Sequence, residues 1–237
     1  MIRSLVVDLD AAAALREIAR CGEPRLAAIA LAAEMSGADA VRLSANEALR
    51  PVRESDLHDV RRVVRQLELR LAPTPSLLKL ALEVRPDRVV LASEPTRDRL
   101  DAAPLDAAAL RHALPPAARA LREAGIPVWV RIAPEPESVK LARGTEIAGV
   151  ELSSVGTIDL PDSERAAALE RFGDAARLAS KLRLPIGVAG GLEAGRVRTI
   201  VLAAPILERV VVGRALVGRA LLVGIERAVR ELRAELA

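Results

Sequence analysis

The feature that most constrains the fold of this chain is a repeated alternation of short β-branched runs with longer Ala-, Leu- and Arg-rich segments of helical period. This alternation predicts a parallel sheet whose strands are connected by crossover helices. Strands are predicted at residues 4–10, 40–44, 69–72, 88–92, 128–133, 149–153, 185–188 and 209–212. Helices are predicted at residues 24–35, 55–67, 75–84, 106–124, 137–142, 163–182, 193–203 and 219–236.

Eight strand-and-helix units in 237 residues match the size of a (β/α)8 TIM barrel, which typically has about 250 residues. A doubly wound sheet is the alternative, but no Gly-x-Gly-x-x-Gly pattern follows the first predicted strand. Because no break in composition marks a second domain, we predict one α/β TIM barrel over residues 1–237. Residues 95–116 are predicted to form a long loop after the fourth strand, and such loops often act as lids.

The composition narrows the classes of partner. Hydrophobic residues make up 51% of the chain and charged residues 28%, but there is only one Trp, one Phe and no Tyr. This argues against aromatic stacking of single-stranded nucleic acid. Arg residues occur beside acidic residues and the net charge is only +3, which favours solvated helix faces over a DNA-binding surface. The single cysteine, Cys21, excludes an internal disulfide and a Cys-built zinc site.

The sequence also predicts the cellular location of the protein. The first apolar run is very short before acidic residues follow, which is not typical of a signal peptide. The most apolar stretch is interrupted by Glu208, Arg209, Arg214 and Arg219, so no membrane-spanning helix is expected. We expect a cytoplasmic protein that binds neither nucleic acid nor membrane, and the sequence predicts no cofactor and no metal.

In a barrel, functional residues follow the carboxyl ends of the strands, and glycines stand at two such ends. Val-Ala-Gly-Gly-Leu (188–192) follows the seventh strand and Val-Gly-Arg-Ala (212–215) follows the eighth. These loops form the usual phosphate site of TIM barrels, where backbone N–H groups approach the ligand closely. We therefore predict that Gly190, Gly191, Gly213 and Arg214 bind phosphate; the alternative is that the glycines only form tight turns.

Three carboxylates are candidates for acid–base chemistry. Asp8 and Asp10 are two residues apart in a predicted strand, so their side chains are expected on the same side, near the barrel mouth. With Glu151, after the sixth strand, they could form a general-base cluster or bind a hard cation, although their spacing identifies no metal site. The alternative is that the aspartates cap and ion-pair with Arg16 and Arg20.

Other reactive side chains are predicted to lie away from the mouth. The only histidines, His58 and His112, fall inside predicted helices, and Cys21 lies in the first connection. The only lysines, which also fall in helical segments, are Lys79, Lys140 and Lys181. Any chemistry would therefore depend on carboxylates, Ser, Arg and backbone amides.

Several short motifs follow one another in a recognisable order. They are Val-x-Leu-Asp-x-x-x-x-Leu-Arg (7–16), Ala-x-x-Ala-Glu-x-x-Gly-Ala-Asp (about residues 29–40), Val-Arg-Pro (84–86), Leu-x-x-Ala-Gly-Ile-x-Val (121–128), Gly-Leu (191–192) and Gly-Arg-Ala-Leu-Val-Gly-Arg-Ala (213–220). On these motifs the chain resembles pyridoxine 5'-phosphate synthase, the PdxJ family, over nearly its whole length. The resemblance implies a TIM barrel with additional helices that assembles as a homo-oligomer, usually an octamer.

The resemblance also implies a reaction. That reaction condenses 1-deoxy-D-xylulose 5-phosphate with 3-amino-2-oxopropyl phosphate to give pyridoxine 5'-phosphate, phosphate and water. Both substrates carry phosphate, which agrees with the glycine-rich strand ends. By the same resemblance, Asp10 matches the family's first-strand aspartate, Asp8 replaces an asparagine, and Glu151 matches the sixth-strand glutamate. Gly191 and Gly213 match glycines of the phosphate site.

The family's catalytic pattern is largely missing. His-Leu-Arg-Glu-Asp-Arg-Arg-His after the second strand is replaced by Ser-Ala-Asn-Glu-Ala-Leu-Arg-Pro (44–51), which removes two histidines and an arginine. Asn-Leu-Glu-Met-Ala, with the catalytic glutamate, has no counterpart in Arg-Leu-Ala-Pro-Thr (70–74). Ala-Gly-His-Gly-Leu and Gly-His-Ala also lose their histidines, and Asp-Ala-Ala-Pro (101–104) stands where the family has its Thr-Thr-Glu-Gly-Gly lid motif.

Three hypotheses about function follow. The first is a catalytically degenerate barrel of the pyridoxine 5'-phosphate synthase type that retains a phosphate pocket and binds a phosphorylated small molecule or partners another subunit, such as an authentic homologue. The second is a divergent enzyme that acts on phosphorylated substrates with Asp8, Asp10 and Glu151 as acid and base. The third is a purely structural oligomer without a ligand.

Overall fold

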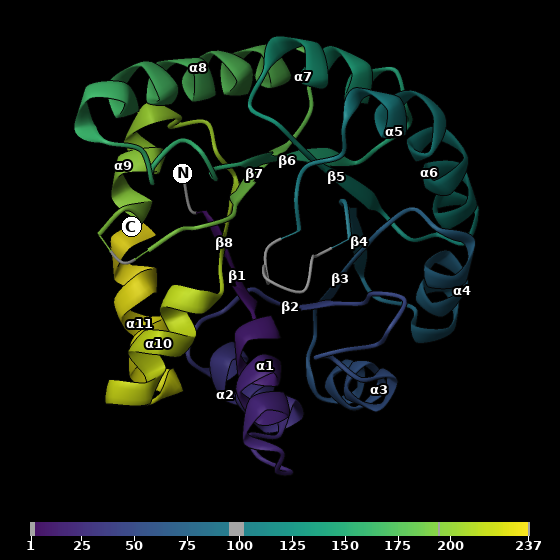
Figure 1. Ribbon diagram of the computed structural model, residues 1–237, viewed down its shortest axis with the longest axis vertical. Coiled ribbons are helices and arrows are strands. Elements are labelled where there is room, and N and C mark those ends of the chain that lie inside the picture. The colour runs from purple at the N-terminus through teal and green to yellow at the C-terminus, as the bar shows by residue number, and fades with distance from the viewer. Residues whose placement is uncertain (1–2, 95–101, 194, 237) are drawn as a thin grey trace.

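The barrel is closed and consists only of parallel strands (Figure 1). The computed structural model describes residues 3–94, 102–193 and 195–236. The strands lie in sequence order around the barrel: β1 (Ser4–Asp8), β2 (Ala40–Ser44), β3 (Leu67–Leu71), β4 (Arg88–Leu91), β5 (Val128–Ile132), β6 (Gly149–Ser153), β7 (Ile186–Ala189) and β8 (Arg209–Val212). Pairing of Ser4 with Arg209 closes the ring between β1 and β8. The predicted TIM barrel is confirmed.

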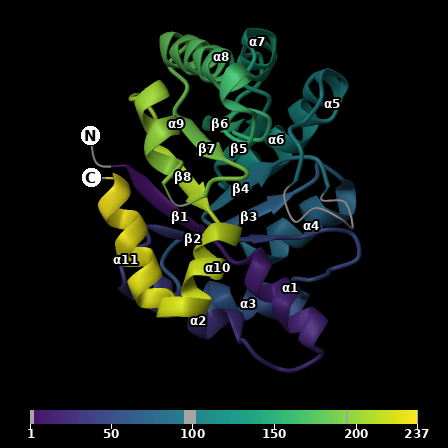
Figure 2. The ribbon, with the colours of Figure 1, turned by 60° about the vertical axis from the view of Figure 1, so that its left-hand side comes forward.

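Helices surround the barrel on its outer side (Figures 1 and 2). They are α1 (Asp10–Ala19), α2 (Leu26–Met35), α3 (Glu54–Val63), α4 (Pro75–Val84), α5 (Ala107–His112), α6 (Leu114–Glu123), α7 (Pro136–Arg143), α8 (Asp162–Lys181), α9 (Val197–Ala203), α10 (Arg214–Val223) and α11 (Ile225–Leu236). Figure 2 shows α11 running back toward the start of β1. There Arg233 donates a hydrogen bond to the Arg3 carbonyl at 2.8 Å and pairs with Asp39.

The helix predictions were wrong at four places. The predicted helix 55–67 was too long, because α3 ends at Val63 and Leu67 already belongs to β3. The first strand was extended to residue 10 and no helix was expected before residue 24, whereas α1 begins at Asp10, because the alanine-rich run after it has strong helix propensity. The predicted helix 106–124 is divided at Ala113, just before two prolines. The predicted helix 219–236 begins earlier, at Arg214, and is divided by Gly224, whose φ of +81° ends α10.

The long loop predicted at residues 95–116 is only partly described. Residues 95–101 lie outside the described part of the chain. From residue 102 the segment is held against the barrel: the Ser93 amide donates to the Ala103 carbonyl at 3.0 Å, and the Ser93 hydroxyl donates to the Pro104 carbonyl at 2.8 Å. Helix α5 already begins at Ala107, so the irregular part is shorter than predicted.

The apolar core lies between the barrel and its helices. Along each strand the side chains alternate, and one set points outward to the helices. In β1 this set includes Leu5 and Val7, and in β2 it includes Val41 and Leu43, all with 0% exposure. The apolar residues by which the strands were predicted therefore include those that form the outer face of the barrel.

The inside of the barrel is charged rather than aliphatic. TIM barrels are usually filled with layers of branched apolar side chains. Here a small apolar cluster of Val6, Ala40, Ala189 and Val211 is accompanied by inward-facing charged residues that are at most 3% exposed. These residues are Arg42, Glu68, Arg70, Arg131, Glu151 and Arg209.

One large ring fills the end of the barrel at which the strands begin. The Trp129 indole of β5 lies against two glycines, Gly149 in the adjacent strand β6 and Gly187 in the following strand β7. A Cβ atom at position 149 would lie 2.6 Å from the ring, and one at position 187 would lie 3.2 Å from it. The glycines thus provide the space that the indole occupies.

Candidate functional site

One connected network below the barrel mouth joins five of the interior charges: Arg42, Glu68, Arg131, Glu151 and Arg209. Arg42 donates to Glu68 Oε2 through Nε and Nη2, at 3.3 and 3.0 Å, and to Glu151 Oε1 through Nη1, at 3.0 Å. Arg131 Nε donates to the same Glu151 oxygen at 2.8 Å. Burial disfavours the Glu151 carboxylate, but the charges of Arg42 and Arg131 outweigh it and hold the pKa of Glu151 well below its usual range.

The lower part of this network contains an excess of arginine. Arg88 Nη1 donates to Glu68 Oε1 at 2.5 Å, and Arg209 also bonds to Glu68. Both guanidiniums lie over the face of Trp129, at 5.2 and 4.4 Å from the ring centroid. Burial and the nearby Arg42 lower the pKa of Arg209 to about 10, although Glu68 opposes the shift, so Arg209 remains charged at neutral pH.

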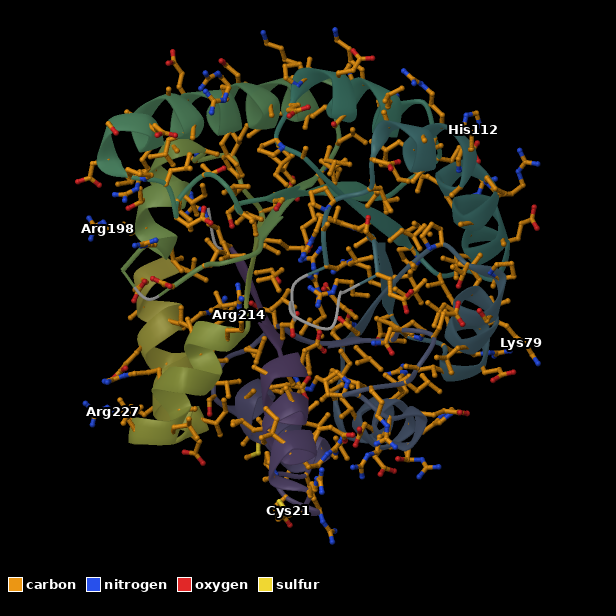
Figure 3. The ribbon with its side chains drawn as sticks, viewed as in Figure 1. Cys21, Lys79, His112, Arg198, Arg214 and Arg227 are labelled. Atoms are coloured by element: carbon orange, nitrogen blue, oxygen red, sulfur yellow. The ribbon has the colours of Figure 1, made fainter. Side chains whose placement is uncertain are left out.

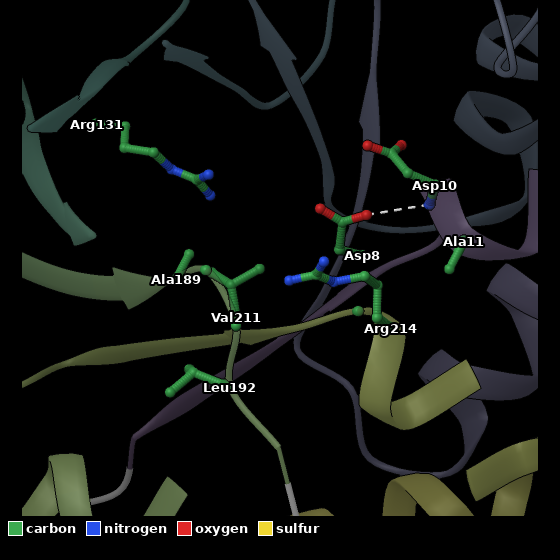
Figure 4. A pocket seen from close by; sticks show the side chains of 11 residues that line it. Asp8, Asp10, Ala11, Arg131, Ala189, Leu192, Val211 and Arg214 are labelled. Carbon is green, nitrogen blue, oxygen red and sulfur yellow. Dashed lines mark hydrogen bonds between the residues drawn. The ribbon is translucent and has the colours of Figure 1, made fainter. Parts of the chain in front are cut away.

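Above the network, a pocket opens at the carboxyl ends of β1, β7 and β8 (Figure 4). Its empty volume, including the part open to solvent, is about 410 Å³. The lining residues are Asp8, Asp10, Ala11, Arg131, Ala189, Gly190, Gly191, Leu192, Val211, Gly213 and Arg214.

The two aspartates occupy one wall of the pocket. Asp8 ends β1, and its Oδ1 accepts a hydrogen bond from the Asp10 amide at 3.0 Å. Asp10 is the first residue of α1 rather than the end of an extended strand, so the turn into the helix, not strand alternation, brings the two carboxylates together. Asp10 accepts from the Ser44 amide at 2.9 Å and from Arg70 at 2.8 Å. Neither aspartate bonds to the helical Arg16, which pairs with Asp56 instead.

Asp8 has unusual electrostatics for a carboxyl group beside an opening. It is only 8% exposed. Burial and the neighbouring charge of Asp10 raise the pKa of Asp8 to about 6, although Arg70 and Arg42 act in the opposite direction. A proton on Asp8 therefore equilibrates with solvent close to physiological pH.

The glycines at the end of β7 form a turn with positive φ angles that residues with a side chain rarely adopt. Gly190 and Gly191 have φ angles of +102° and +66°, and a Cβ atom at position 190 would lie 2.9 Å from Val155 Cγ2. The Ser154 hydroxyl donates to the carbonyl groups of Ala189 and Gly190 and holds the turn in place. The backbone here thus has a fixed, side-chain-free surface.

The glycine at the end of β8 allows a close approach to Asp8. A Cβ atom at Gly213 would lie 3.1 Å from Asp8 Cβ. Arg214 follows as the first residue of α10, so the N-terminal end of this helix lies at the pocket. In Figure 4 the guanidinium groups of Arg214 and Arg131 point toward the same space beside Asp8.

Arg131 was not among the predicted site residues, and of the network below it only Glu151 was predicted. Arg131 lines the pocket, and its Nη1 donates to the Ala102 carbonyl at 2.8 Å. A sequence signal for it exists, because Val-Trp-Val-Arg-Ile places a charge in the middle of an apolar strand. In a parallel sheet buried on both faces, such a charge must face a partner inside the barrel.

The remaining candidates lie elsewhere. Glu151, at 0% exposure, is below the pocket rather than in its lining. His58 lies on α3 and His112 on α5, both on the outside of the barrel, where Figure 3 also shows Cys21 and Lys79. Among the described lining residues there is no His, Cys or Lys. The described part of the chain contains no cluster of three or more His, Cys, Asp or Glu arranged for a metal ion.

Comparison with known proteins identifies the family. A sequence model described as "Pyridoxal phosphate biosynthesis protein PdxJ" matches residues 5–237. The chain belongs to the PdxJ family. PdxJ relatives include the pyridoxine 5'-phosphate synthase of Syntrophobacter fumaroxidans, 32% identical over 97% of both chains. The pyridoxine 5'-phosphate synthase of Geobacter metallireducens is 30% identical over 96% of both chains.

Solved structures outside the PdxJ family share the fold. Thiamine phosphate pyrophosphorylase from Pyrococcus furiosus has a TM-score of 0.62 at 16% identity, covering 99% of this chain and 95% of that one. A mutant tryptophan synthase alpha-subunit from Pyrococcus furiosus has a TM-score of 0.61 at 18% identity, covering 100% and 98%. At such low identity these similarities establish the barrel architecture only. No helix in the described residues of this PdxJ chain is long and apolar enough to cross a membrane.

Proposed function

We propose that this PdxJ barrel binds a phosphorylated small molecule at the ends of β7 and β8 and no longer catalyses the condensation of its family. The observation that carries the proposal is the composition of one pocket. Two glycine turns, the start of α10 and two guanidinium groups meet there, while its described lining contains no imidazole. Oxyanions bind to backbone amides, helix N-terminal ends and arginine, whereas proton transfer is most often carried out by histidine.

The anion-binding half of the proposal follows from where positive potential is found. The turn at Gly190 and Gly191 presents backbone without side chains, and Arg214 begins α10 beside Gly213. These two strand-end loops are the usual phosphate-binding position of TIM barrels. Arg131, whose position is fixed by Glu151, adds a second guanidinium at the opposite wall. A phosphate group in this space would contact charge from both sides.

The loss of catalysis follows from what the pocket lacks. The condensation implied by the family requires several proton transfers, and each positioned acid or base typically contributes about 10²- to 10⁴-fold in rate. His58 and His112 are on outer helices, and the residues at 44–51 contain no histidine. Asp8 and Asp10 are the remaining titratable carboxylates of the lining. We therefore expect the purified chain to show negligible pyridoxine 5'-phosphate synthesis.

A divergent enzyme is the second candidate, and one observation favours it. Burial and Asp10 raise the pKa of Asp8 to about 6, a value suited to an acid or base near neutral pH. Asp8 is better placed for this role than Glu151, which is held by two arginines below the pocket. Rescue of a pyridoxine auxotroph by this chain would support an enzyme and contradict the degenerate barrel.

Binding can be measured by calorimetry with inorganic phosphate, phosphorylated trioses and pentoses, and pyridoxine 5'-phosphate. Arg214→Gln removes one charge-assisted bond, and we expect about tenfold to hundredfold weaker binding. Arg198→Gln is the matched control, because Arg198 is an exposed arginine on α9, away from the pocket (Figure 3). Flat titrations with every phosphorylated compound would overturn the proposed binding function.

A further inference from the structure

The positions of the Asp8 oxygens create a charge problem for any anion in the pocket. Oδ1 accepts from the Asp10 amide, and Oδ2 lies 3.5 Å from Arg70 Nη1. Asp10 shares the same arginine, so Arg70 serves two carboxylates at once. Figure 4 shows the Asp8 carboxyl group facing the space toward which Arg131 and Arg214 point.

An ionised carboxylate has only acceptor oxygens, as does a phosphate or sulfate dianion. Placed together in a pocket of low exposure, the two groups repel each other and cannot form a hydrogen bond. A neutral Asp8 has neither difficulty, because its O–H group can donate to an oxygen of the anion. The proton therefore changes Asp8 from an obstacle into a ligand-binding donor.

We propose that the pocket binds its oxyanion together with one proton, which is carried on the Asp8 carboxyl group. In this equilibrium, the free protein with ionised Asp8 takes up one dianion and one proton from solvent and gives the complex with neutral Asp8. No covalent bond forms or breaks. This inference rests on the proposed phosphate-binding function and makes Asp8 the residue that determines which charge state of the pocket accepts a ligand.

The charges around Asp8 favour its protonation when an anion binds. Burial and Asp10 raise the pKa of Asp8 to about 6, and Arg70 and Arg42 limit the rise. An added dianion raises the pKa further, because it is a second negative neighbour. The charged groups that face Asp8 come from five elements: Asp10 of α1, Arg42 of β2, Arg70 of β3, Arg131 of β5 and Arg214 of α10.

The test uses inorganic sulfate as the probe, because sulfate remains dianionic between about pH 5 and pH 8 whereas a phosphate monoester titrates near pH 6. Calorimetry in two buffers of different ionisation enthalpy gives the number of protons taken up. We expect an uptake close to one proton per sulfate at about pH 7.5, falling toward zero near pH 5. The dissociation constant should rise up to about tenfold for each pH unit above 6.

Asp8→Asn is the decisive variant, because asparagine keeps the acceptor for the Asp10 amide and supplies a permanent donor. It should bind sulfate with little dependence on pH and take up no proton. Asp59→Asn makes the same chemical change at an exposed site on α3 and should behave like the parent chain. The proton count of the unmodified chain needs no variant, so a poorly folding Asp8→Asn protein would not prevent the test.

The outcomes separate this inference from the function on which it rests. Sulfate binding at about pH 7.5 without proton uptake, or an Asp8→Asn chain that retains the parent pH dependence, would overturn the proton coupling and leave the anion site standing. Absence of binding by sulfate and by every phosphorylated compound between about pH 5 and pH 8 would overturn the proposed function itself.

Discussion

Replacing Arg42 by methionine should weaken the barrel more than any surface substitution can. The guanidinium is completely buried and bridges Glu68 and Glu151. Methionine has similar length but no charge, so both carboxylates lose their shared partner. Removing one partner of a buried ion pair typically costs about 3–5 kcal/mol. Because Glu151 keeps Arg131 and Glu68 keeps its other arginines, we expect a loss near 3 kcal/mol, or roughly 6–12 °C in Tm for a chain of this size.

The same variant should show a defined pH dependence. In the parent protein, arginine neighbours hold the pKa values of Glu68 and Glu151 below their ordinary values. Carboxylates of this kind stabilise the fold above their unfolded pKa of about 4.3, and the contribution is lost as pH falls through the folded value. The folded pKa values rise when Arg42 is absent, so the difference in stability between the two proteins should be largest at neutral pH and smaller near pH 4.

The assay is urea unfolding followed by fluorescence of Trp129, which is the only tryptophan and lies inside the barrel. Arg177→Met is the control, because Arg177 is exposed on α8 and pairs with Asp174 of the same helix, so its loss should change stability by less than about 0.5 kcal/mol. An Arg42→Met midpoint equal to that of the parent at neutral pH would refute the reasoning, as would a penalty that does not shrink in acid.

Two further substitutions and one control test the glycine turn after β7 and the ion pair between α1 and α3. In thermal melts, Gly190→Ala should destabilise the chain by about 1–3 kcal/mol, because its φ of +102° is unsuited to alanine and the added Cβ meets Val155. Gly218→Ala is the control, because Gly218 lies in open space on α10, and this variant should stabilise the chain by about 0.4–1 kcal/mol. Asp56→Asn should lose about 1.5–3 kcal/mol of its bidentate pair with Arg16. Although burial opposes it, Arg16 lowers the pKa of that aspartate, so the loss measured by urea unfolding should diminish as pH falls below about 4, and a loss that is constant with pH would contradict this account.

The fold could be predicted because its signal is local and repeated. Apolar residues recur with a period of two in strands and of 3.6 in helices, so the two kinds of segment can be told apart along the chain. All eight strands were placed close to their observed positions. Helix α1 was missed because the predicted strand was extended across Asp8 and Leu9 to Asp10, and no Gly or Pro precedes the alanines to mark its end. Gly224 and the prolines at 115 and 116 were visible as breakers, but their effect was underestimated within long helical patterns.

The candidate site could be predicted only at its rim. Asp8 ends β1, and Gly190, Gly213 and Arg214 follow β7 and β8, so one rule about strand ends is enough to bring them together. The network below them depends on which strand positions face inward and on how the strands are staggered around the closed barrel. A charged residue such as Arg42 can be recognised as inward-facing from sequence, but its pairing with Glu151, 109 positions away, requires the register of the closed sheet.

The indole at the lower end of the barrel links the evolution of three positions. With Trp129 present, position 149 cannot hold a side chain, since even a methyl group would overlap the ring. Conversely, a descendant that lost the ring would contain a void lined by two glycines and two arginines, which invites larger residues to enter. Natural variants should therefore exchange these positions in concert, and a lineage with a small residue at 129 should have acquired bulk at 149 or 187.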